Sequence, residues 1–513
     1  MKEYLKKVLQ ARVYEVAKKT PLEKAKNLSR RFKNNIYLKR EDLQEVFSFK
    51  IRGAYNKMQN LTKEQLSRGV ITSSAGNHAQ GVALSALKLK TNATILMPIT
   101  TPIVKVNAVK ELKAEVILFG DNYDESYIEA QRLSKERELS FIHPFNDPEV
   151  IAGQGTIGVE LLSQLKDPPD AIYIAVGGGG LIAGISIYIK NLWPTTKIIG
   201  IEPEDADAMT RSLKEKKIIE LDNVGLFADG VAVKKVGKLT FDIAKQYVDK
   251  MITVNTDEIC AAIKDVFEDT RSILEPAGAL SIAGMKKDIA VSDYKNKNLV
   301  AIACGANMNF ERLRFVAERA ELGEYKEVMF AVEIPERPGS LVELCKLLKK
   351  RNLTEFSYRM SNSSSAQIFM GIEVKGITDK DNLINIFNNS HHKFIDITND
   401  ELSKNHLRHM VGGRLPSEIS KSKNEELIEL LYRFEFPERP GALMNFLKSM
   451  RPDWSISIFH YRNHGADVGR IVIGVLINKN GLKEWFDFLN VLGYKYWDES
   501  NNQTYKLFLG ASN

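Results

Sequence analysis

The chain has 513 residues, 44% hydrophobic and 27% charged, which is an ordinary globular composition but too long for one hydrophobic core. Two to four domains are therefore expected. Lys and Arg number 72 against 65 Asp and Glu, an excess of +7 that is small for this length and spread along the chain, so no nucleic-acid partner is expected.

Cysteine use and hydropathy exclude two further classes. Cys260, Cys304 and Cys345 are far apart and fit neither a disulfide framework nor the ligand spacing of a zinc site. The first residues lack the apolar region of a leader peptide, and no stretch approaches the roughly 18 apolar residues of a membrane span. We expect a soluble, cytoplasmic protein with no membrane partner.

Short apolar runs alternate with amphipathic helical stretches between about residues 20 and 320. The clearest runs are 70–73, 93–97, 115–119, 172–176, 197–201 and 299–303. Near-continuous apolar runs, rich in β-branched residues and separated by helices, predict buried parallel strands in open α/β sheets. Ligands of such sheets bind at the carboxyl ends of the strands.

Two motifs follow in chain order. In residues 48–55 (SFKIRGAY), Lys50 stands at a predicted helix start, where the positive dipole end favours the neutral amine that a Schiff base requires. A solvated surface lysine is the alternative.

Residues 73–81 (SSAGNHAQG) follow a strand. Their small residues could hold a carboxylate, and Asn77 offers an amide. An ordinary helix cap is the alternative, and His78 is catalytic or a satisfied structural histidine.

A glycine run and a strand end complete the set. Residues 176–181 (VGGGGL) lie between a predicted strand and helix, where backbone N–H groups can surround a phosphate, although a plain turn is possible. Cys304 follows the last strand and is either a buried filler or a ligand contact. A phosphate loop, a poised lysine, a carboxylate loop and a neutral strand-end group together specify pyridoxal 5'-phosphate.

An internal repeat marks the last part of the chain. Residues 332–341 (VEIPERPGSL) are echoed by residues 434–443 (FEFPERPGAL), 102 positions later. Each copy predicts a strand, a turn and a helix (341–349 and 443–450), followed by a further strand (366–370 and 470–475). We expect two related α+β modules joined by a polar stretch at 417–426, with domain boundaries at 1–322, 328–400 and 427–508.

The order and wording of these motifs resemble the biosynthetic threonine ammonia-lyases (threonine deaminases) of the fold-type II pyridoxal-phosphate enzymes. Residues 38–44 (LKREDLQ) and 304–310 add to the likeness, which runs over nearly the whole chain. It implies a tryptophan synthase β-like catalytic region of two open parallel-sheet subdomains, followed by two ACT-like modules. The implied reaction converts L-threonine to 2-oxobutanoate and ammonia, the first committed step of isoleucine biosynthesis.

The resemblance also implies residue roles. Lys50 carries the cofactor and abstracts the Cα proton, Phe49 packs on its ring, and Cys304 faces the pyridine nitrogen, where many members have Ser. A neutral partner there favours elimination over transamination. The phosphate is bound by Gly177, Gly178, Gly179, Gly180 and Leu181. The ring hydroxyl is bound by Asn77, and the substrate carboxylate by Ser74, Ala75, Gly76 and Asn77.

The resemblance also bears on regulation and on the competing functions. By the resemblance, isoleucine is an inhibitor and valine is often an activator, and the protein is a homotetramer. Tyr358 and Tyr461 are the candidate effector contacts, with simple packing in a sheet as the alternative. By the resemblance, related enzymes place an acidic metal ligand where this chain has Ala208, so no metal-binding residue is assigned. A threonine or cysteine synthase is disfavoured by residues 48–53. A serine-directed dehydratase and a non-catalytic amino-acid-binding regulator stay open, although Lys50 and Asn77 argue against the regulator.

Overall fold

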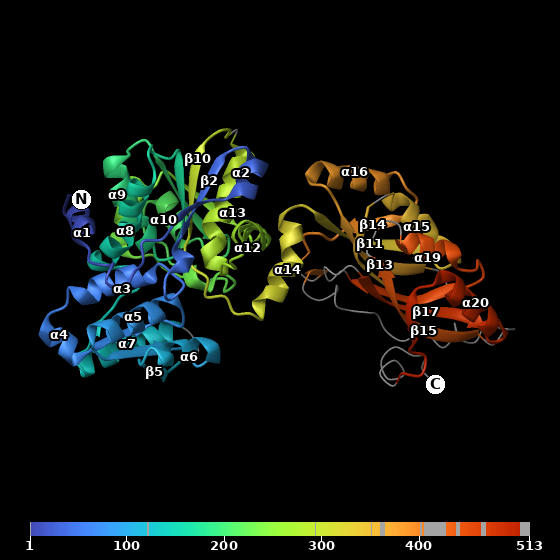
Figure 1. Ribbon diagram of the computed structural model, residues 1–513, viewed down its shortest axis with the longest axis horizontal. Helices are drawn as coiled ribbons and strands as arrows, with labels where there is room; N and C mark the ends of the chain where they lie inside the picture. Colours follow the sequence, from blue (N-terminus) through green and yellow to red (C-terminus); the bar gives the residue numbers. More distant parts are fainter. Residues whose placement is uncertain are drawn as a thin grey trace. The chain divides into compact units, whose positions relative to one another are not determined.

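The computed structural model describes most of the chain and divides it into two compact units, Met1–Gly323 and Glu324–Asn513 (Figure 1). The described residues are 2–120, 123–292, 294–349, 351–359, 365–400, 403–404, 427–437, 442–462 and 468–502. The predicted joining stretch 417–426 and most of the second PERPG turn, residues 438–441, lie outside them. Within these ranges, every helix is too short or too polar to span a lipid bilayer.

The larger sheet of the first unit is parallel except for one edge strand. Its described strands, in spatial order, are β1 (Leu22–Lys24), β2 (Asn35–Arg40), β10 (Asn298–Ala303), β7 (Ala171–Ala175), β8 (Lys197–Pro203) and β9 (Lys250–Val254). The helices of this layer are α1 (Lys2–Gln10), α2 (Lys26–Phe32), α8 (Pro148–Gln164), α9 (Gly180–Leu192), α10 (Ala208–Glu215), α11 (Lys238–Tyr247), α12 (Thr256–Thr270), α13 (Pro276–Val291) and α14 (Arg312–Gly323). All five residues of β7 are buried, because α8 and α9 cover one face of the sheet and α12 and α13 the other (Figure 1).

The smaller sheet of the first unit is parallel throughout its described strands. Their order is β5 (Glu115–Leu118), β4 (Ala93–Met97), β3 (Val70–Ser73) and β6 (Ser140–Phe141). Its helices are α4 (Lys63–Arg68), α5 (Asn77–Leu89), α6 (Ile103–Glu111) and α7 (Tyr123–Glu136). Val70 and Ile95 pack with residues of α5, whereas Ile71 and Leu96 pack with residues of α7. Successive side chains of β3 and β4 are thus buried on opposite faces, as their apolar runs predict.

Helix α3 (Lys50–Gln59) joins the two sheet layers by packing closely against α8 and α5. A β-carbon at Gly53 would lie 2.3 Å from Gln154 Nε2, and one at Gly153 would lie 2.5 Å from the Arg52 carbonyl oxygen. On the other side, a β-carbon at Gly81 of α5 would lie 3.2 Å from Ile51 N. These glycines let the helix backbones approach, which fixes the position of the first turn of α3.

A buried cluster of four charged side chains anchors that same turn. Arg52 donates from Nε and Nη2 to the two carboxylate oxygens of Glu41, at 2.7 and 2.8 Å, and from Nη1 to Glu160 Oε1 at 2.7 Å. Lys39 pairs with the other oxygen of Glu160, and all four side chains are at most 1% exposed. Burial is the largest single influence on the pKa of Glu41 and would raise it. The charges of Arg52 and Lys39 and the hydrogen bonds from Arg52 and Thr20 together outweigh burial, so the pKa is lowered.

We expect Arg52→Ala to lower the free energy of unfolding by about 3–5 kcal/mol, because it leaves two buried carboxylates without their main partner. Urea denaturation of the full chain, followed by circular dichroism, measures the change. The control is Arg68→Ala, which breaks an exposed ion pair with Glu64 and should cost less than about 1 kcal/mol. Equal losses in the two variants would contradict this assignment.

The second unit holds a single antiparallel sheet in its described residues. Its strand order is β14 (Lys393–Asp396), β11 (Glu327–Pro335), β13 (Ser365–Glu373), β12 (Leu353–Arg359), β16 (Ser455–Arg462), β17 (Val468–Asn478), β15 (Leu427–Pro437) and β18 (Lys495–Asp498). The helices are α15 (Ser340–Leu348), α16 (Ile377–Asn388), α19 (Ala442–Ser449) and α20 (Leu482–Leu492). The two repeats meet where β12 pairs with β16, so their strand orders mirror each other across this joint.

Matching details in the two halves show the repeat at the level of side chains. The register shifts at Thr354 in β12 and at Ser457 in β16, so both strands carry a bulge at the same place. Each hydroxyl donates to a glutamate of the first strand of its repeat, Glu327 or Glu429. A glycine on the intervening strand leaves room, since a β-carbon there would lie 2.3 or 2.6 Å from the hydroxyl oxygen.

The α/β fold class is confirmed, and the six predicted strands occur as β3, β4, β5, β7, β8 and β10. The predicted strands and helices of the repeats occur as β11, α15, β13, β15, α19 and β17. Strand β2 was missed because its polar residues Lys39 and Arg40 are buried through ion pairs and interrupt the apolar pattern. The other missed strands of the first unit are short or edge strands: β1, β6 and β9.

Candidate active site

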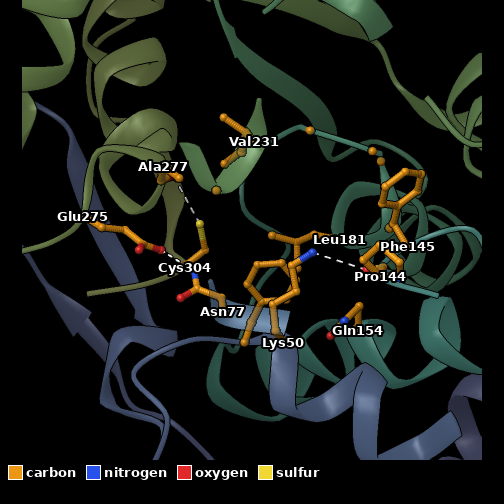
Figure 2. Close-up of a pocket in the computed structure, with 17 residues that line it drawn as sticks. Lys50, Asn77, Pro144, Phe145, Gln154, Leu181, Val231, Glu275, Ala277 and Cys304 are labelled. Atoms are coloured by element: carbon orange, nitrogen blue, oxygen red, sulfur yellow. Dashed lines mark hydrogen bonds between the residues drawn. The ribbon is translucent and has the colours of Figure 1, made fainter. Parts of the chain in front are cut away.

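Strands β3, β7 and β10 end at a common pocket of the first unit (Figure 2). The structure brings together there nine residues predicted from sequence: Phe49, Lys50, Asn77, Gly177, Gly178, Gly179, Gly180, Leu181 and Cys304. The pocket is also lined by residues that the sequence did not single out: Pro144, Phe145, Gln154, Ala175, Gly230, Val231, Glu275 and Ala277.

Lys50 is the first residue of α3, and its amine reaches the pocket. Nζ donates to the carbonyl oxygen of Pro144 at 3.3 Å and lies 5.5 Å from the centre of the Phe49 ring. The residues just before it are tied to the end of β10: Phe49 N donates to the Cys304 carbonyl at 3.2 Å, and Ser48 bridges to Gly305. Lysine, aromatic ring and thiol thus share one wall.

Burial in this pocket lowers the pKa of Lys50 to about 8, against the opposing influence of Cys304 and Glu275. The sequence suggested a lowered value because of the dipole at the start of the helix. In the structure, loss of hydration disfavours the ammonium more than Cys304 and Glu275 stabilise it, and this lowers the pKa. A substantial fraction of the side chain is therefore a neutral amine near pH 8.

The glycine loop forms a cradle before α9. Gly179 has a φ of +90° and Gly180 begins the helix, so unpaired N–H groups of the first turn point into the loop. A β-carbon at Gly178 would lie 2.2 Å from the ring of Phe145, and one at Gly177 would lie 2.8 Å from Val231 Cα. Only glycine fits at both positions. A plain turn does not require this, so the loop is better explained as a phosphate cradle.

Cys304 is buried, as one of the two sequence interpretations predicts, and its contact with a ligand stays a prediction. The thiol is 4% exposed and donates to the carbonyl oxygen of Ala277 at 3.4 Å, yet it lines the pocket. Burial raises the pKa of the thiol well above its ordinary value, so it stays protonated and neutral.

Glu275 is a pocket residue that sequence reasoning missed. Its Oε1 accepts a hydrogen bond from Asn77 Nδ2 at 2.5 Å (Figure 2). Burial raises the pKa of the carboxyl to about 7, although the Asn77 hydrogen bond opposes the rise. The available signal was the Glu275-Pro276 pair, which marks a helix start because Pro is favoured at the first helical position.

The predicted carboxylate loop adjoins the pocket. Ser74, Ala75 and Gly76 form the half-buried turn before α5, and Asn77 alone of this loop is among the residues that line the pocket. His78 is buried, with Nε2 2.9 Å from the Ile142 carbonyl, and burial lowers its pKa to about 3. A neutral, structural histidine fits these facts.

The two predicted effector residues lie in different surroundings. Tyr358 lines a cavity of about 440 Å³ in the second unit, and its hydroxyl lies 2.7 Å from Glu336 Oε1 and 2.9 Å from the Ile456 carbonyl. Tyr461 packs in the hydrophobic core and is not among the described residues that line this cavity.

Glu202, of the Glu202-Pro203 pair near the end of β8, caps the start of α10. It accepts hydrogen bonds from Met209 N, Thr210 N and Thr210 Oγ1 at 2.9, 2.8 and 2.6 Å. The described residues contain no group of three or more side chains able to hold a metal ion.

The fold and this pocket define a pyridoxal-phosphate enzyme of the fold-type II class. The family model "Pyridoxal-phosphate dependent enzyme" matches residues 13–305, and "C-terminal regulatory domain of Threonine dehydratase" matches residues 318–407 and 420–509. The chain is 53% identical to the biosynthetic L-threonine dehydratase of Burkholderia multivorans over 510 residues, 99% of each chain. It is 47% identical to that of Escherichia coli, over 99% of this chain and 97% of the relative. The chain belongs to the biosynthetic threonine dehydratase family.

Solved structures agree with this placement. The processed threonine deaminase isoform 2 from Solanum lycopersicum is 52% identical and covers 62% of this chain and 88% of its own, with a TM-score of 0.61. The serine racemase of maize is 31% identical and covers 61% and 96%, with a TM-score of 0.58. Pyridoxal 5'-phosphate is the family's cofactor. The glycine cradle, which has no side chains to fill it, and the Lys50 amine in the pocket both fit this cofactor.

We expect the rate at which the cofactor-free protein couples to pyridoxal 5'-phosphate to rise with pH through about 8 and then level off. The reason is that only the neutral amine attacks, and the pocket lowers the pKa of Lys50 to about 8. Growth of visible absorbance after mixing, between pH 6.5 and 10.5, measures it. A rate that keeps rising toward pH 10.5 would mean that the pocket does not lower the pKa.

Proposed function

We propose that this chain dehydrates and deaminates L-threonine to 2-oxobutanoate and ammonia, the first committed step of isoleucine biosynthesis. The observation that carries the proposal is the Lys50 amine with its lowered pKa, in a pocket closed by the glycine cradle. Membership of the biosynthetic threonine dehydratase family supports the choice of substrate.

The cofactor, when bound, supplies the electron sink that lets a proton leave the Cα carbon of an amino acid. Lys50, a substantial fraction of which is a neutral amine near pH 8, is placed to hold the cofactor and then to accept that proton at Nζ. The N–H groups of the loop from Gly177 to Leu181 bind the phosphate, and Phe49, on the wall that Lys50 shares, packs on the ring.

The remaining roles concern orientation. The turn formed by Ser74, Ala75 and Gly76, with Asn77, offers N–H groups and a hydroxyl at the start of α5 to the substrate carboxylate. Asn77 also binds the ring hydroxyl. The neutral thiol of Cys304 meets the ring nitrogen without a charge, which favours loss of the β-hydroxyl over transamination.

L-Serine is a second substrate in this proposal. A likeness to the serine racemase from Dictyostelium discoideum, 34% identical with a TM-score of 0.55, favours a pocket that admits the smaller amino acid. One methyl group distinguishes the two substrates by only about 1–3 kcal/mol in an apolar pocket. Absence of product from serine at high enzyme concentration would remove this part of the proposal.

We expect Lys50→Ala to lower kcat for threonine by at least about a thousandfold, because no other pocket side chain can take both roles. Formation of 2-oxoacid measures the loss. The control is Lys57→Ala, on the same helix but paired with Asp147, which should keep most of the activity. Wild-type speed in Lys50→Ala would contradict the proposal, and a cofactor-loaded wild type without an adduct on Lys50 after borohydride would favour the non-catalytic regulator.

Regulation is proposed for the cavity at Tyr358. The start of α15 and Ser340 offer donors to a carboxylate, Glu336 offers an acceptor to an ammonium, and Leu341 and Trp454 supply apolar walls. Burial raises the pKa of Glu336. These features suit a branched-chain amino acid, with isoleucine as the inhibitor and valine as a possible activator. The regulatory-domain match supports an amino-acid effector, and Tyr461 is the proposed contact of the second repeat.

Two broader proposals go with this function. A homotetramer is supported by the resemblance to the long-form enzymes, and light scattering against the 57.8 kDa chain mass measures it. A cytoplasmic location is supported by Cys260, Cys304 and Cys345, all buried and unpaired, as expected in a reducing compartment. An extracytoplasmic location in cell fractionation would contradict it.

We expect Tyr358→Phe to raise the isoleucine concentration for half-inhibition about five- to tenfold, with kcat in the absence of isoleucine unchanged. The hydroxyl lies 2.7 Å from Glu336, so its loss frees that carboxyl and disturbs the proposed ammonium site. Inhibition curves at fixed threonine measure the shift. Tyr247→Phe, on α11 of the first unit, is the matched control and should leave the curve unmoved. An unchanged curve for Tyr358→Phe would contradict this site.

A further inference from the structure

The side-chain amide of Asn77 is held at both of its ends. Its Nδ2 donates to Glu275 Oε1 at 2.5 Å, and its Oδ1 accepts from Asn307 Nδ2 at 2.6 Å. Asn307 Nδ2 also donates to the Val46 carbonyl at 2.9 Å, so both of its hydrogens are used. Because a carbonyl only accepts, this chain of bonds assigns the amide orientation of Asn307 and, through it, that of Asn77.

Glu275 contacts Asn77 instead of capping the helix that follows it. It is the residue that precedes α13, where a carboxylate could cap the helix, yet its side chain makes no capping hydrogen bond. The carboxyl turns instead toward Asn77, and it is 5% exposed. Space for it depends on Gly305, where a β-carbon would lie 2.2 Å from Glu275 Oε1. The arrangement is specific to this pair.

We propose that Glu275 and Asn307 are positioning residues that keep the second N–H of Asn77 directed at the cofactor's ring oxygen. The inference rests on the proposed function, which assigns that oxygen to Asn77. With Glu275 and Asn307 in place, one amide hydrogen of Asn77 is used and the other serves the pocket. Without them the amide can turn over and present its oxygen to the ring oxygen, where two acceptors would meet.

We expect that removing Glu275 or Asn307 weakens cofactor binding, and that it does so only by its effect on Asn77. Glu275→Ala should raise the dissociation constant of pyridoxal 5'-phosphate about tenfold, and Asn307→Ala should raise it by a similar factor. Glu275→Gln keeps an oxygen that accepts the same hydrogen bond, so its dissociation constant should stay within about twofold of the wild type. The dissociation constant is measured by fluorescence titration of the cofactor-free protein, independently of activity.

The deciding measurement is a double-mutant cycle. In an Asn77→Ala background, Glu275→Ala should change the dissociation constant by no more than about twofold, because its effect acts through the missing amide. The same tenfold loss in both backgrounds would overturn the proposal. So would an unchanged dissociation constant in both Glu275→Ala and Asn307→Ala.

A control separates positioning from general damage. Asp288→Asn alters another buried acid of α13, paired with Tyr173 and Lys250, and should leave the cofactor dissociation constant unchanged. A tenfold loss there would assign the Glu275 effect to the helix rather than to Asn77 and overturn the proposal. Wild-type protein that forms no adduct with the cofactor at Lys50 would overturn the proposed function and this inference together. If the adduct forms but the losses of cofactor affinity in Glu275→Ala and Asn77→Ala are additive, this inference alone is overturned.

Discussion

The first unit of this protein depends on the bidentate ion pair between Arg52 and Glu41. Arg52 follows Lys50 by two residues, so the ion cluster that fixes one also fixes the other. A buried ion cluster contributes little net stability compared with apolar packing of the same volume, because desolvation offsets the attraction. Its bonds are directional, however, and they tie η1 (Glu41–Leu43), α3 and α8 into one geometry. We interpret the cluster as a device that sets where Lys50 points.

Loss of hydration then moves the ionisable groups around the pocket toward neutrality. It lowers the pKa of Lys50 to about 8 and that of His78 to about 3, and it raises the pKa of Glu275 to about 7. The thiol of Cys304 is also kept neutral. In the proposed function, the phosphate of the cofactor is held by backbone N–H groups at the start of α9, whose dipoles need no counter-ion of their own.

The second unit solves a different problem, which is how two repeats form one sheet. Pairing of β12 with β16 gives each repeat's edge strand a partner, and the bulges at Thr354 and Ser457 lie on these two central strands. Tyr358 lies on β12 at this joint, within reach of Glu336 of its own repeat and the Ile456 carbonyl of the other. A ligand that moves Tyr358 would therefore act on both repeats.

Local sequence determined the parts of this protein whose signals are local. The apolar runs predicted six strands of the first unit, the repeat of PERPG predicted paired modules, and the strand-glycine-helix order predicted the cradle at Gly177 to Gly180. Only the tertiary structure decided which distant side chains meet. The Glu275-Pro276 pair marks a helix start and Asn307 lies in the 304–310 motif, but neither local pattern shows that both side chains contact Asn77, which is about 200 residues away in the chain. The lowered pKa of Lys50 likewise arises mainly from burial, a property of the folded pocket that no run of neighbouring residues encodes.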